Sequence, residues 1–351
     1  EPGAGGASRD TEKTAVPEAI NSSNEEQPMA QERKDRGFYK KYYREIDVVH
    51  ALQTKPEDRE WLLSTPPDNV KQSDVVLYLG CNVLRTTHMI QIVTDIFKLM
   101  GISYAAVGGK TYCCGIQHYQ RGDEEAARSV AATTAANFQK FNPKQVVMWC
   151  PSCIYFYDDI MDMRGKSFDF NHVAEFLVDH IDELDFKPQP ETTVSMHYHT
   201  GREQSDAEAR SAHFLLSKLP GVTLIDVGTD ARFGRHCTPA VREKMGEEAW
   251  ENMATGFVEK AIEQGADTFA TLYHGCQRHM CRYEADYPVK VEHYLTLVGR
   301  ALGIEHEDLH KKHVLSGDID AIMEETSPCA VANNISPEEA RLTIEKNYAA
   351  R

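Results

Sequence analysis

The chain has 351 residues, of which 41% are apolar, so it is long enough for two ordinary domains with packed cores. Acidic residues outnumber basic ones by 54 to 38, which gives a formal net charge of -16. This balance argues against a general nucleic-acid binder or anionic-membrane binder, because phosphate surfaces attract lysine and arginine, and it favours a basic partner surface. No apolar run approaches the roughly 20 residues needed to span a bilayer, and the first residues lack the basic-then-apolar order of a secretory signal.

The five regions of the chain differ in composition. Residues 1–36 are rich in Gly, Ser, Glu, Pro and Gln, which predicts a disordered or partner-binding arm. Residues 37–73 carry aromatic and aliphatic residues in a pattern typical of one or two short amphipathic helices. We expect two α/β lobes over 74–188 and 189–314, and a C-terminal tail over 315–351 that acts as a lid or docking segment.

Apolar runs alternate with helical stretches through both lobes. We expect strands at 75–80, 102–108, 145–149, 193–199, 222–228 and 267–274, and helices at 84–100, 123–140, from 154 onward, 205–218, 239–264 and 277–285. Short apolar strands alternating with helices are typical of parallel sheets. The pattern therefore predicts an α/β fold of two Rossmann-like lobes with parallel sheets, preceded by an extended N-terminal arm.

The second lobe repeats features of the first. Cys237 and Cys276 each lie 123 residues after a cysteine of the first lobe, and the stretch 168–181 is similar to 287–302. A repeat at constant spacing indicates that the two lobes arose by duplication.

Five of the nine cysteines, an odd total, lie within a short part of the chain. They are Cys81, Cys113, Cys114, Cys150 and Cys153. Local spacing and an odd total favour metal ligation in a reducing compartment, such as the cytoplasm, over secreted disulfides. Because ligands gather at the carboxyl ends of parallel strands, we expect these cysteines to meet at one sheet edge.

The residues alone leave two other interpretations of this set open. A thioredoxin-like dithiol at Cys150 and Cys153 would leave three cysteines unexplained. Structural zinc would use four ligands and leave one cysteine over. Five thiolates also exceed the four that a cubane iron–sulfur cluster uses.

The cysteine pattern resembles that of the CCG cysteine-rich domain family, which includes the B-type subunit of heterodisulfide reductase and relatives in lactate, glycolate and succinate oxidation. The pattern is one cysteine, a gap of 31 residues, Cys113-Cys114-Gly115, a gap of 34 further residues, then Cys150-Pro-Ser-Cys153. The resemblance covers roughly residues 73–305, and among the relatives it favours the heterodisulfide-reductase-like systems of sulfur-oxidising bacteria. It implies that the five cysteines bind a non-cubane [4Fe-4S] cluster.

The resemblance also implies an oxidoreductase subunit that acts on disulfide, thiol or persulfide sulfur. Its partners would be an iron–sulfur subunit with cubane clusters and a flavin subunit, and its substrate a thiol or disulfide, free or carrier-bound. The chain has no Gly-rich dinucleotide fingerprint after its first strand, so a flavin or nicotinamide would have to come from another subunit. Two alternatives stay open: a non-catalytic electron-transfer or assembly subunit, and a structural zinc protein.

The second lobe keeps two cysteines of the pattern and adds histidines. Cysteine and neutral imidazole together suit zinc, or an iron–sulfur cluster with histidine ligands. We therefore predict a second metal site from Cys237, Cys276, Cys281 and one histidine, His236.

Four further polar residues in the same loops are candidates for catalysis. His197, His199 or His274 could supply protons or bind an anionic thiol. Arg202 could hold a carboxylate or phosphate of the substrate, and Arg85 occupies an analogous place after Cys81.

Overall fold

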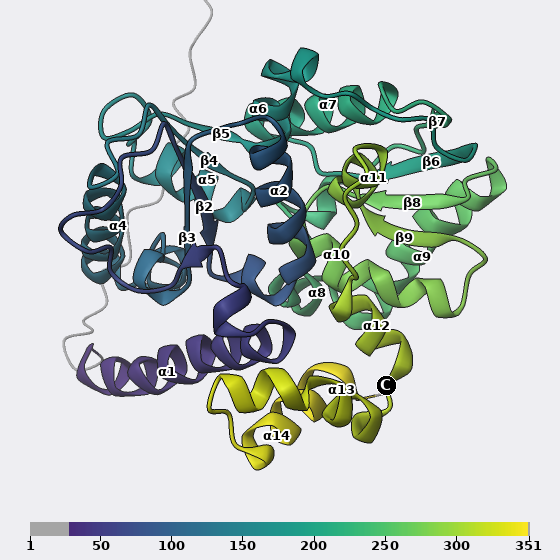
Figure 1. The fold of residues 1–351 in the computed structure, drawn as a ribbon. Helices are drawn as coiled ribbons and strands as arrows, with labels where there is room; N and C mark the ends of the chain where they lie inside the picture. Colours follow the sequence, from purple (N-terminus) through teal and green to yellow (C-terminus); the bar gives the residue numbers. More distant parts are fainter. Residues whose placement is uncertain (1–27, 350–351) are drawn as a thin grey trace, which may run out of the picture. The chain divides into compact units, whose positions relative to one another are not determined.

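The computed structural model describes residues 28–349 (Figure 1). Residues 1–39 and 40–351 form two compact units. In the first unit, the described part is the beginning of helix α1 (Pro28–Gln53), and the rest of this helix belongs to the second unit. The arm predicted over 1–36 lies mostly outside the described residues.

The first sheet has five parallel strands in the order β1-β3-β2-β4-β5. The strands are β1 (Trp61–Leu62), β2 (Val75–Gly80), β3 (Tyr104–Gly108), β4 (Gln145–Met148) and β5 (Phe170–His172). Every residue of β2 is buried, as expected for a central parallel strand with helices on both faces.

The second sheet has four parallel strands in the order β7-β6-β8-β9. The strands are β6 (Thr192–His197), β7 (Val222–Ile225), β8 (Thr268–Thr271) and β9 (Lys290–His293). Without β1, the first sheet has the same order of successive strands as the second. The prediction of an α/β fold with two parallel sheets is therefore confirmed.

A histidine marks the same place in both sheets. His172 ends β5 and caps α6 (Val173–Asp179), and His293 ends β9 and caps α11 (Tyr294–Ala301). In each case the histidine ring accepts a hydrogen bond from the backbone N–H of the residue two positions later. The similarity between 168–181 and 287–302 therefore corresponds to the same strand–cap–helix unit.

The helices follow the predicted order, with differences at their ends. They are α2 (Thr87–Leu99), α3 (Ile116–Tyr119), α4 (Glu124–Gln139), α5 (Pro151–Tyr155), α7 (Glu203–Ser217), α8 (Pro239–Met245), α9 (Glu247–Glu263) and α10 (His274–Met280). The helix predicted at 239–264 is in fact two helices, α8 and α9, because Gly246 between them has a φ of 93°. The short strands β1, β5 and β9 and the helices α3, α6 and α11 were not predicted.

The two sheets are joined through helix pairs. Helix α2 of the first lobe packs against α11 of the second, and α6 packs against α7. At the first crossing, a Cβ atom on Gly299 would lie 2.9 Å from Cγ2 of Ile92. The absence of a side chain on Gly299 therefore allows α2 and α11 to approach closely.

The C-terminal tail forms three helices: α12 (Leu309–Ser316), α13 (Ile319–Ala332) and α14 (Pro337–Tyr348). Val48 and Leu52 of α1 are buried with Ile344 of α14 in one apolar cluster, and Arg44 pairs with Glu339 at 2.6 Å. The role of the tail as a lid or docking segment stays a prediction.

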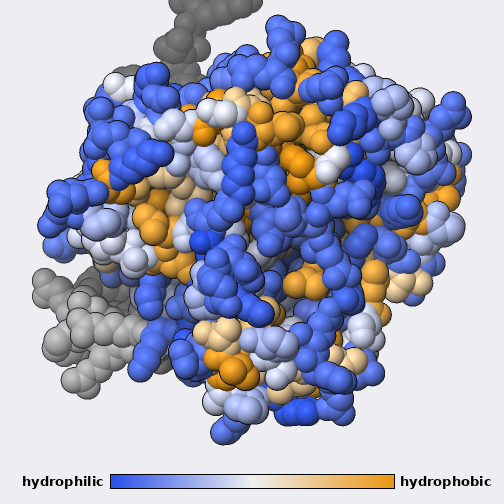
Figure 2. Space-filling view, viewed as in Figure 1, coloured by the Kyte–Doolittle hydropathy of each residue, from blue (hydrophilic) through white to orange (hydrophobic). Residues whose placement is uncertain are grey.

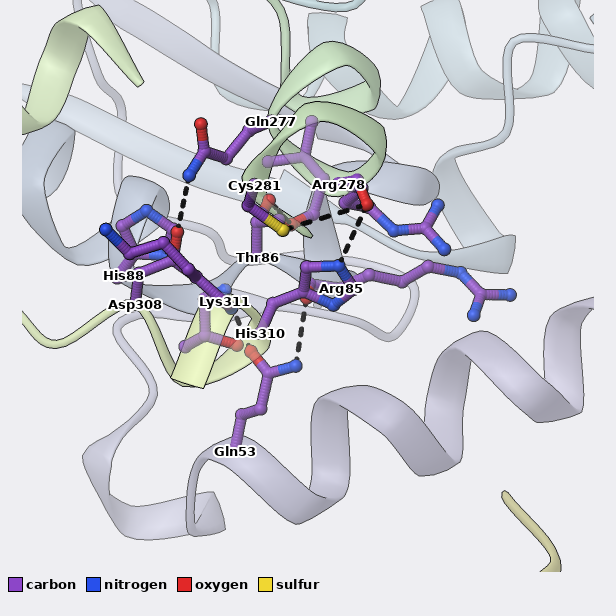
Figure 3. A network of polar contacts seen from close by, with 12 residues as sticks. Gln53, Arg85, Thr86, His88, Gln277, Arg278, Cys281, Asp308, His310 and Lys311 are labelled. Carbon is purple, nitrogen blue, oxygen red and sulfur yellow. Dashed lines mark hydrogen bonds and ion pairs between the residues drawn. The ribbon is translucent and has the colours of Figure 1, made fainter. Parts of the chain in front are cut away.

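A buried polar network connects α1 and α12 to both lobes (Figure 3). Gln53 of α1 donates to the carbonyl of Arg85, which follows β2, and Gln277 of α10 donates to Asp308 at 2.9 Å. Asp308 also lies 3.4 Å from His88 of α2. The segment that follows Cys81 is thus bound on one side by α1 and on the other by the start of α12.

The visible face of the molecule is mostly hydrophilic, with hydrophobic side chains gathered over α6 and α7 (Figure 2). On α7, Phe214 is 39% exposed. In the part of the chain that the structure describes, no helix combines the length and apolarity needed to cross a bilayer.

We expect Gly115→Ala to destabilise the first lobe. Gly115 has a φ of 100°, and a Cβ atom there would lie 2.5 Å from the carbonyl oxygen of Ala127. Gly122→Ala is a matched control, because Gly122 has a φ of 82° but nothing within 4 Å of the added atom. Thermal unfolding should show a loss of about 1–2 kcal/mol for the control and a larger loss for Gly115→Ala. Equal losses would contradict the packing described here.

Candidate metal centres

Three neighbouring strands of the first sheet lead into cysteines. Cys81 follows β2 directly, the pair Cys113–Cys114 follows β3 after one 3₁₀ turn (Lys110–Tyr112), and Cys150 lies just beyond β4. Since these strands are adjacent and parallel, their carboxyl ends meet at the same edge of the sheet. Cys153 lies in the first turn of α5, on the segment that begins with Cys150.

Glycines allow the cysteine loops to approach each other. Gly80, immediately before Cys81, has a φ of 63°, and a Cβ atom there would lie 3.3 Å from the sulfur of Cys153. Gly115, immediately after Cys114, allows its loop to turn against α4. A side chain at either glycine would push these segments apart.

The five cysteines of the first lobe are linked by pairwise interactions. The sulfur of Cys114 is hydrogen-bonded to Cys113 and Cys153, and Cys153 is hydrogen-bonded to Cys150. The charges of Cys114 and Cys150 act on Cys81 in turn. The structure therefore brings together the five residues that the spacing predicts as one set.

Burial and crowding oppose the ionisation of Cys81, Cys113 and Cys153, whereas hydrogen bonds from Cys113 and Cys153 lower the pKa of Cys114. Cys81 is only 9% exposed, and burial raises its pKa to about 12. Hydrogen bonding to Cys114 raises the pKa of both Cys113 and Cys153 above the usual value. Several thiolates can coexist in such a place only beside compensating positive charge, which bound metal ions supply.

Tyrosines from distant segments surround the five cysteines. The hydroxyl of Tyr43 on α1 lies 2.8 Å from the sulfur of Cys113, and that of Tyr78 on β2 lies 3.8 Å from Cys153. Tyr42 places its hydroxyl 3.9 Å from Cys81. We did not predict these neighbours from the sequence, where the aromatic residues of 37–73 indicated only an amphipathic helix.

The second lobe gathers a compact group of four buried ligands. The ligand atoms of His197, His199, Cys237 and Cys276 all lie within 4.8 Å of one another. Nε2 of His197 lies 3.2 Å from the sulfur of Cys237, and Nε2 of His199 lies 3.1 Å from that of Cys276. Tetrahedral zinc with bonds of about 2.0–2.3 Å holds its ligand atoms roughly 3.3–3.8 Å apart, so this donor set fits a single zinc ion.

The ring orientation of His199 also fits a metal ligand. Its Nδ1 lies 2.8 Å from the carbonyl oxygen of Gly234, and a carbonyl can only accept. Nδ1 therefore carries the proton, and the lone pair of Nε2 points toward the two sulfurs. A backbone carbonyl that fixes the tautomer in this way is a usual partner of metal-bound histidine.

Two residues of the predicted second site lie outside this group. The ring of His236 packs on the start of α10, where a Cβ atom on Gly275 would lie 3.0 Å from it. The sulfur of Cys281 faces the carbonyl oxygen of Arg278 at 3.9 Å. Cys281 lies five residues after Cys276. Because each residue turns a helix by about 100°, its side chain points well away from that of Cys276.

The remaining candidates for catalysis are dispersed. His274 begins α10 and is buried, which lowers its pKa to about 3 and keeps the ring neutral. Arg202 precedes α7 and pairs with Asp159 of the first lobe. Arg85 is buried and pairs with Glu45 at 2.8 Å.

Comparison with known proteins agrees with the cysteine pattern. The family model of the cysteine-rich domain, CCG, matches residues 75–156. The D-type subunit of the dihydromethanophenazine:CoB–CoM heterodisulfide reductase of Methanosarcina mazei is 26% identical over 266 residues. The match covers 71% of this chain and 64% of that relative, so the chain spans less than two thirds of the relative's length.

Solved structures give weaker likenesses. A protein described as an Asp/Glu racemase from Yersinia pestis has a TM-score of 0.33 and 14% identity, with 66% of this chain and 97% of that one covered. An aspartate racemase homologue from Pyrococcus horikoshii has a TM-score of 0.31 and 10% identity, with the same two shares covered. At these TM-scores, neither likeness carries an argument about this chain.

We expect Cys237→Ser and Cys276→Ser to remove a metal ion from the second lobe. Each substitution takes one thiolate from the four-ligand group. Elemental analysis should find about one zinc per chain in the unsubstituted protein and much less in either variant.

Cys281→Ser is the matched control for these two variants, because Cys281 is equally buried and lies on the same segment of the second lobe. It should keep its zinc. Loss of zinc in Cys281→Ser with retention in Cys237→Ser would contradict the assignment of the four ligands.

Proposed function

We propose that this chain, which belongs to the family of the CCG cysteine-rich domain, is the iron–sulfur redox subunit of a heterodisulfide-reductase-like complex. The observation that carries the proposal is the convergence of five thiols from three strand ends. The family model covers the segment that holds all five.

The donor set of the first lobe fits a polynuclear cluster better than a single ion. Five sulfurs exceed the four ligands of tetrahedral zinc. A single metal ion needs several ligand atoms close together. Among the described residues, the second lobe has such a group, with all its ligand atoms within 4.8 Å of one another, and the first lobe has none. A cluster of several irons needs wider spacing, and the non-cubane [4Fe-4S] cluster of the resemblance uses five cysteines.

The five-cysteine set reaches the surface of the molecule at one residue. Cys150 is partly exposed, whereas the other four cysteines are buried. A substrate sulfur could therefore reach the site next to Cys150, which favours a subunit that acts on a thiol, disulfide or persulfide over one that only conducts electrons. The bound cluster would supply one-electron steps to a sulfur–sulfur bond, and the chain's own residues would position the substrate.

The four-ligand group of the second lobe has a structural role in this proposal. It joins the end of β6 to the loop before α8 and to α10, and all four residues are buried. Zinc in such a closed site holds segments together and has no open position for a substrate.

Electrons would pass to or from partner subunits. The relative from Methanosarcina mazei is itself a heterodisulfide reductase subunit, and such a subunit works within a complex. We infer partners that carry cubane clusters and a flavin, and a cytoplasmic location, from the resemblance and from the reducing compartment that nine cysteines without a disulfide favour.

Protein purified without oxygen should contain about four iron and four acid-labile sulfide atoms per chain. Serine in place of any of the five cysteines of the first lobe should lower the iron content, because each supplies one ligand. Cys329→Ser is the control, since Cys329 lies in α13 of the C-terminal tail. A colourless protein with zinc and no labile sulfide would contradict the proposal.

Tyr43→Phe should make the cluster harder to reduce. The hydroxyl of Tyr43 lies 2.8 Å from the sulfur of Cys113, and a hydrogen bond to a ligand sulfur stabilises added negative charge. Loss of a bond worth about 1 kcal/mol corresponds to a drop of roughly 40 mV in a one-electron potential.

Potentiometric titration followed by electron paramagnetic resonance measures this shift. Tyr42→Phe is the comparison variant and should shift the potential less, because its hydroxyl lies 3.9 Å from Cys81. A larger drop for Tyr42→Phe than for Tyr43→Phe would contradict the role of the shorter contact.

A further inference from the structure

Two arginines of the second lobe lie on one tyrosine ring of the first. The guanidinium carbon of Arg235 is 4.0 Å from the centre of the Tyr155 ring, and that of Arg202 is 4.6 Å from it. Tyr155 ends α5, the short helix that begins directly after Cys150. Both arginines therefore contact the short helix that follows the one partly exposed cysteine of the first site.

The two arginines differ in their charge partners. Arg202 pairs with Asp159. Arg235 forms no ion pair with any residue that the structure describes, and its buried Nε has no hydrogen-bond partner. The ionisable groups in its neighbourhood are Tyr155, Arg202, Asp159 and Cys150.

Arg235 is partly buried, and its buried Nε is left without a partner. A guanidinium with a free N–H donor, and with a second guanidinium on the same aromatic ring, is a good site for an anion, because a carboxylate or phosphate can accept two parallel hydrogen bonds from one arginine.

The second metal centre holds the loop that carries Arg235. His199 donates to the carbonyl of Gly234, the residue before Arg235, and Cys237 follows two residues later. Arg235 thus lies between two anchors of the four-ligand group. The backbone of this loop is fixed on both sides of Arg235, which places the arginine next to Tyr155.

We propose that Arg235, supported by Arg202 and the ring of Tyr155, binds an anionic group of the sulfur substrate and directs its sulfur toward the Cys150 side of the first site. The ligand class is a thiol or disulfide that carries a carboxylate, sulfonate or phosphate. This inference rests on the proposed function, and it adds the substrate's charge and the residue that recognises it.

The test compares two disulfides that differ in charge. Both 3,3′-dithiodipropionate, a dicarboxylate, and bis(2-hydroxyethyl) disulfide, which is neutral, would be reduced with viologen as electron donor. Each disulfide takes up two electrons and two protons and yields two thiols. Arg235→Ala should raise KM for the dicarboxylate about tenfold, the loss expected for a hydrogen-bonded charge pair, with kcat and the KM for the neutral disulfide unchanged.

Arg232→Ala is the matched control. Arg232 lies on the same loop but is exposed, and it pairs with Asp230 at 2.7 Å. This variant should behave like the unsubstituted protein. An unchanged visible spectrum in Arg235→Ala would show that the first site is intact.

Calorimetric titration with 3,3′-dithiodipropionate separates this inference from the proposed function. If the unsubstituted protein reduces neither disulfide, the proposed function fails, while binding of the dicarboxylate that is lost in Arg235→Ala and kept in Arg232→Ala still supports the anion site. Equal binding by Arg235→Ala and the unsubstituted protein would overturn the inference. An equal rise in KM for both disulfides would overturn it too, because it would show a structural role only.

Discussion

The constraint on which the rest depends is the crowding of five thiols at one edge of a parallel sheet. Their burial and mutual hydrogen bonds raise the pKa of Cys81, Cys113 and Cys153. Hydrogen bonds from Cys113 and Cys153 lower the pKa of Cys114, so the set favours one thiolate, and further negative charge has no compensation there. Metal binding removes the conflict, since it replaces the thiol protons with multivalent positive charge. The glycines around the site keep the loops close enough for this to occur.

The two lobes use one topology for two kinds of donor set. Both sheets run through the same order of successive strands, and their ligands follow the strand ends. In the first lobe, five neighbouring sulfurs exceed the four ligands of a single tetrahedral ion and suit a cluster of several irons. In the second, two imidazoles and two sulfurs close around a volume that suits one ion. The second donor set is connected to the first lobe by the backbone, because His199 donates to the carbonyl of Gly234 and the next residue, Arg235, packs on Tyr155.

The sequence predicts the local parts of this arrangement well. The sequence predicts the buried apolar strands at 75–80 and 145–149 and the cysteines that follow them. It also predicts where these cysteines lie, because in a parallel sheet the end of a strand determines the position of the next loop. The five-cysteine set could be predicted for this reason. Its role in binding a cluster stays a prediction.

Features that depend on contacts distant in sequence could not be predicted. Tyr43 reaches Cys113 across 70 residues, and no local pattern indicates this. Cys281 looked like a ligand because it lies close to Cys276 in sequence, but the turn of the helix directs its sulfur elsewhere. His197 and His199, which we considered for proton transfer, instead face two cysteines because β6 and its loop end beside α10.

Anomalous X-ray diffraction from crystals grown without oxygen tests the central claim most directly. Data collected on both sides of the iron absorption edge should show strong iron density enclosed by Cys81, Cys113, Cys114, Cys150 and Cys153. Data at the zinc edge should show a single peak among His197, His199, Cys237 and Cys276. Zinc density within the five-cysteine set, with no iron there, would contradict the account.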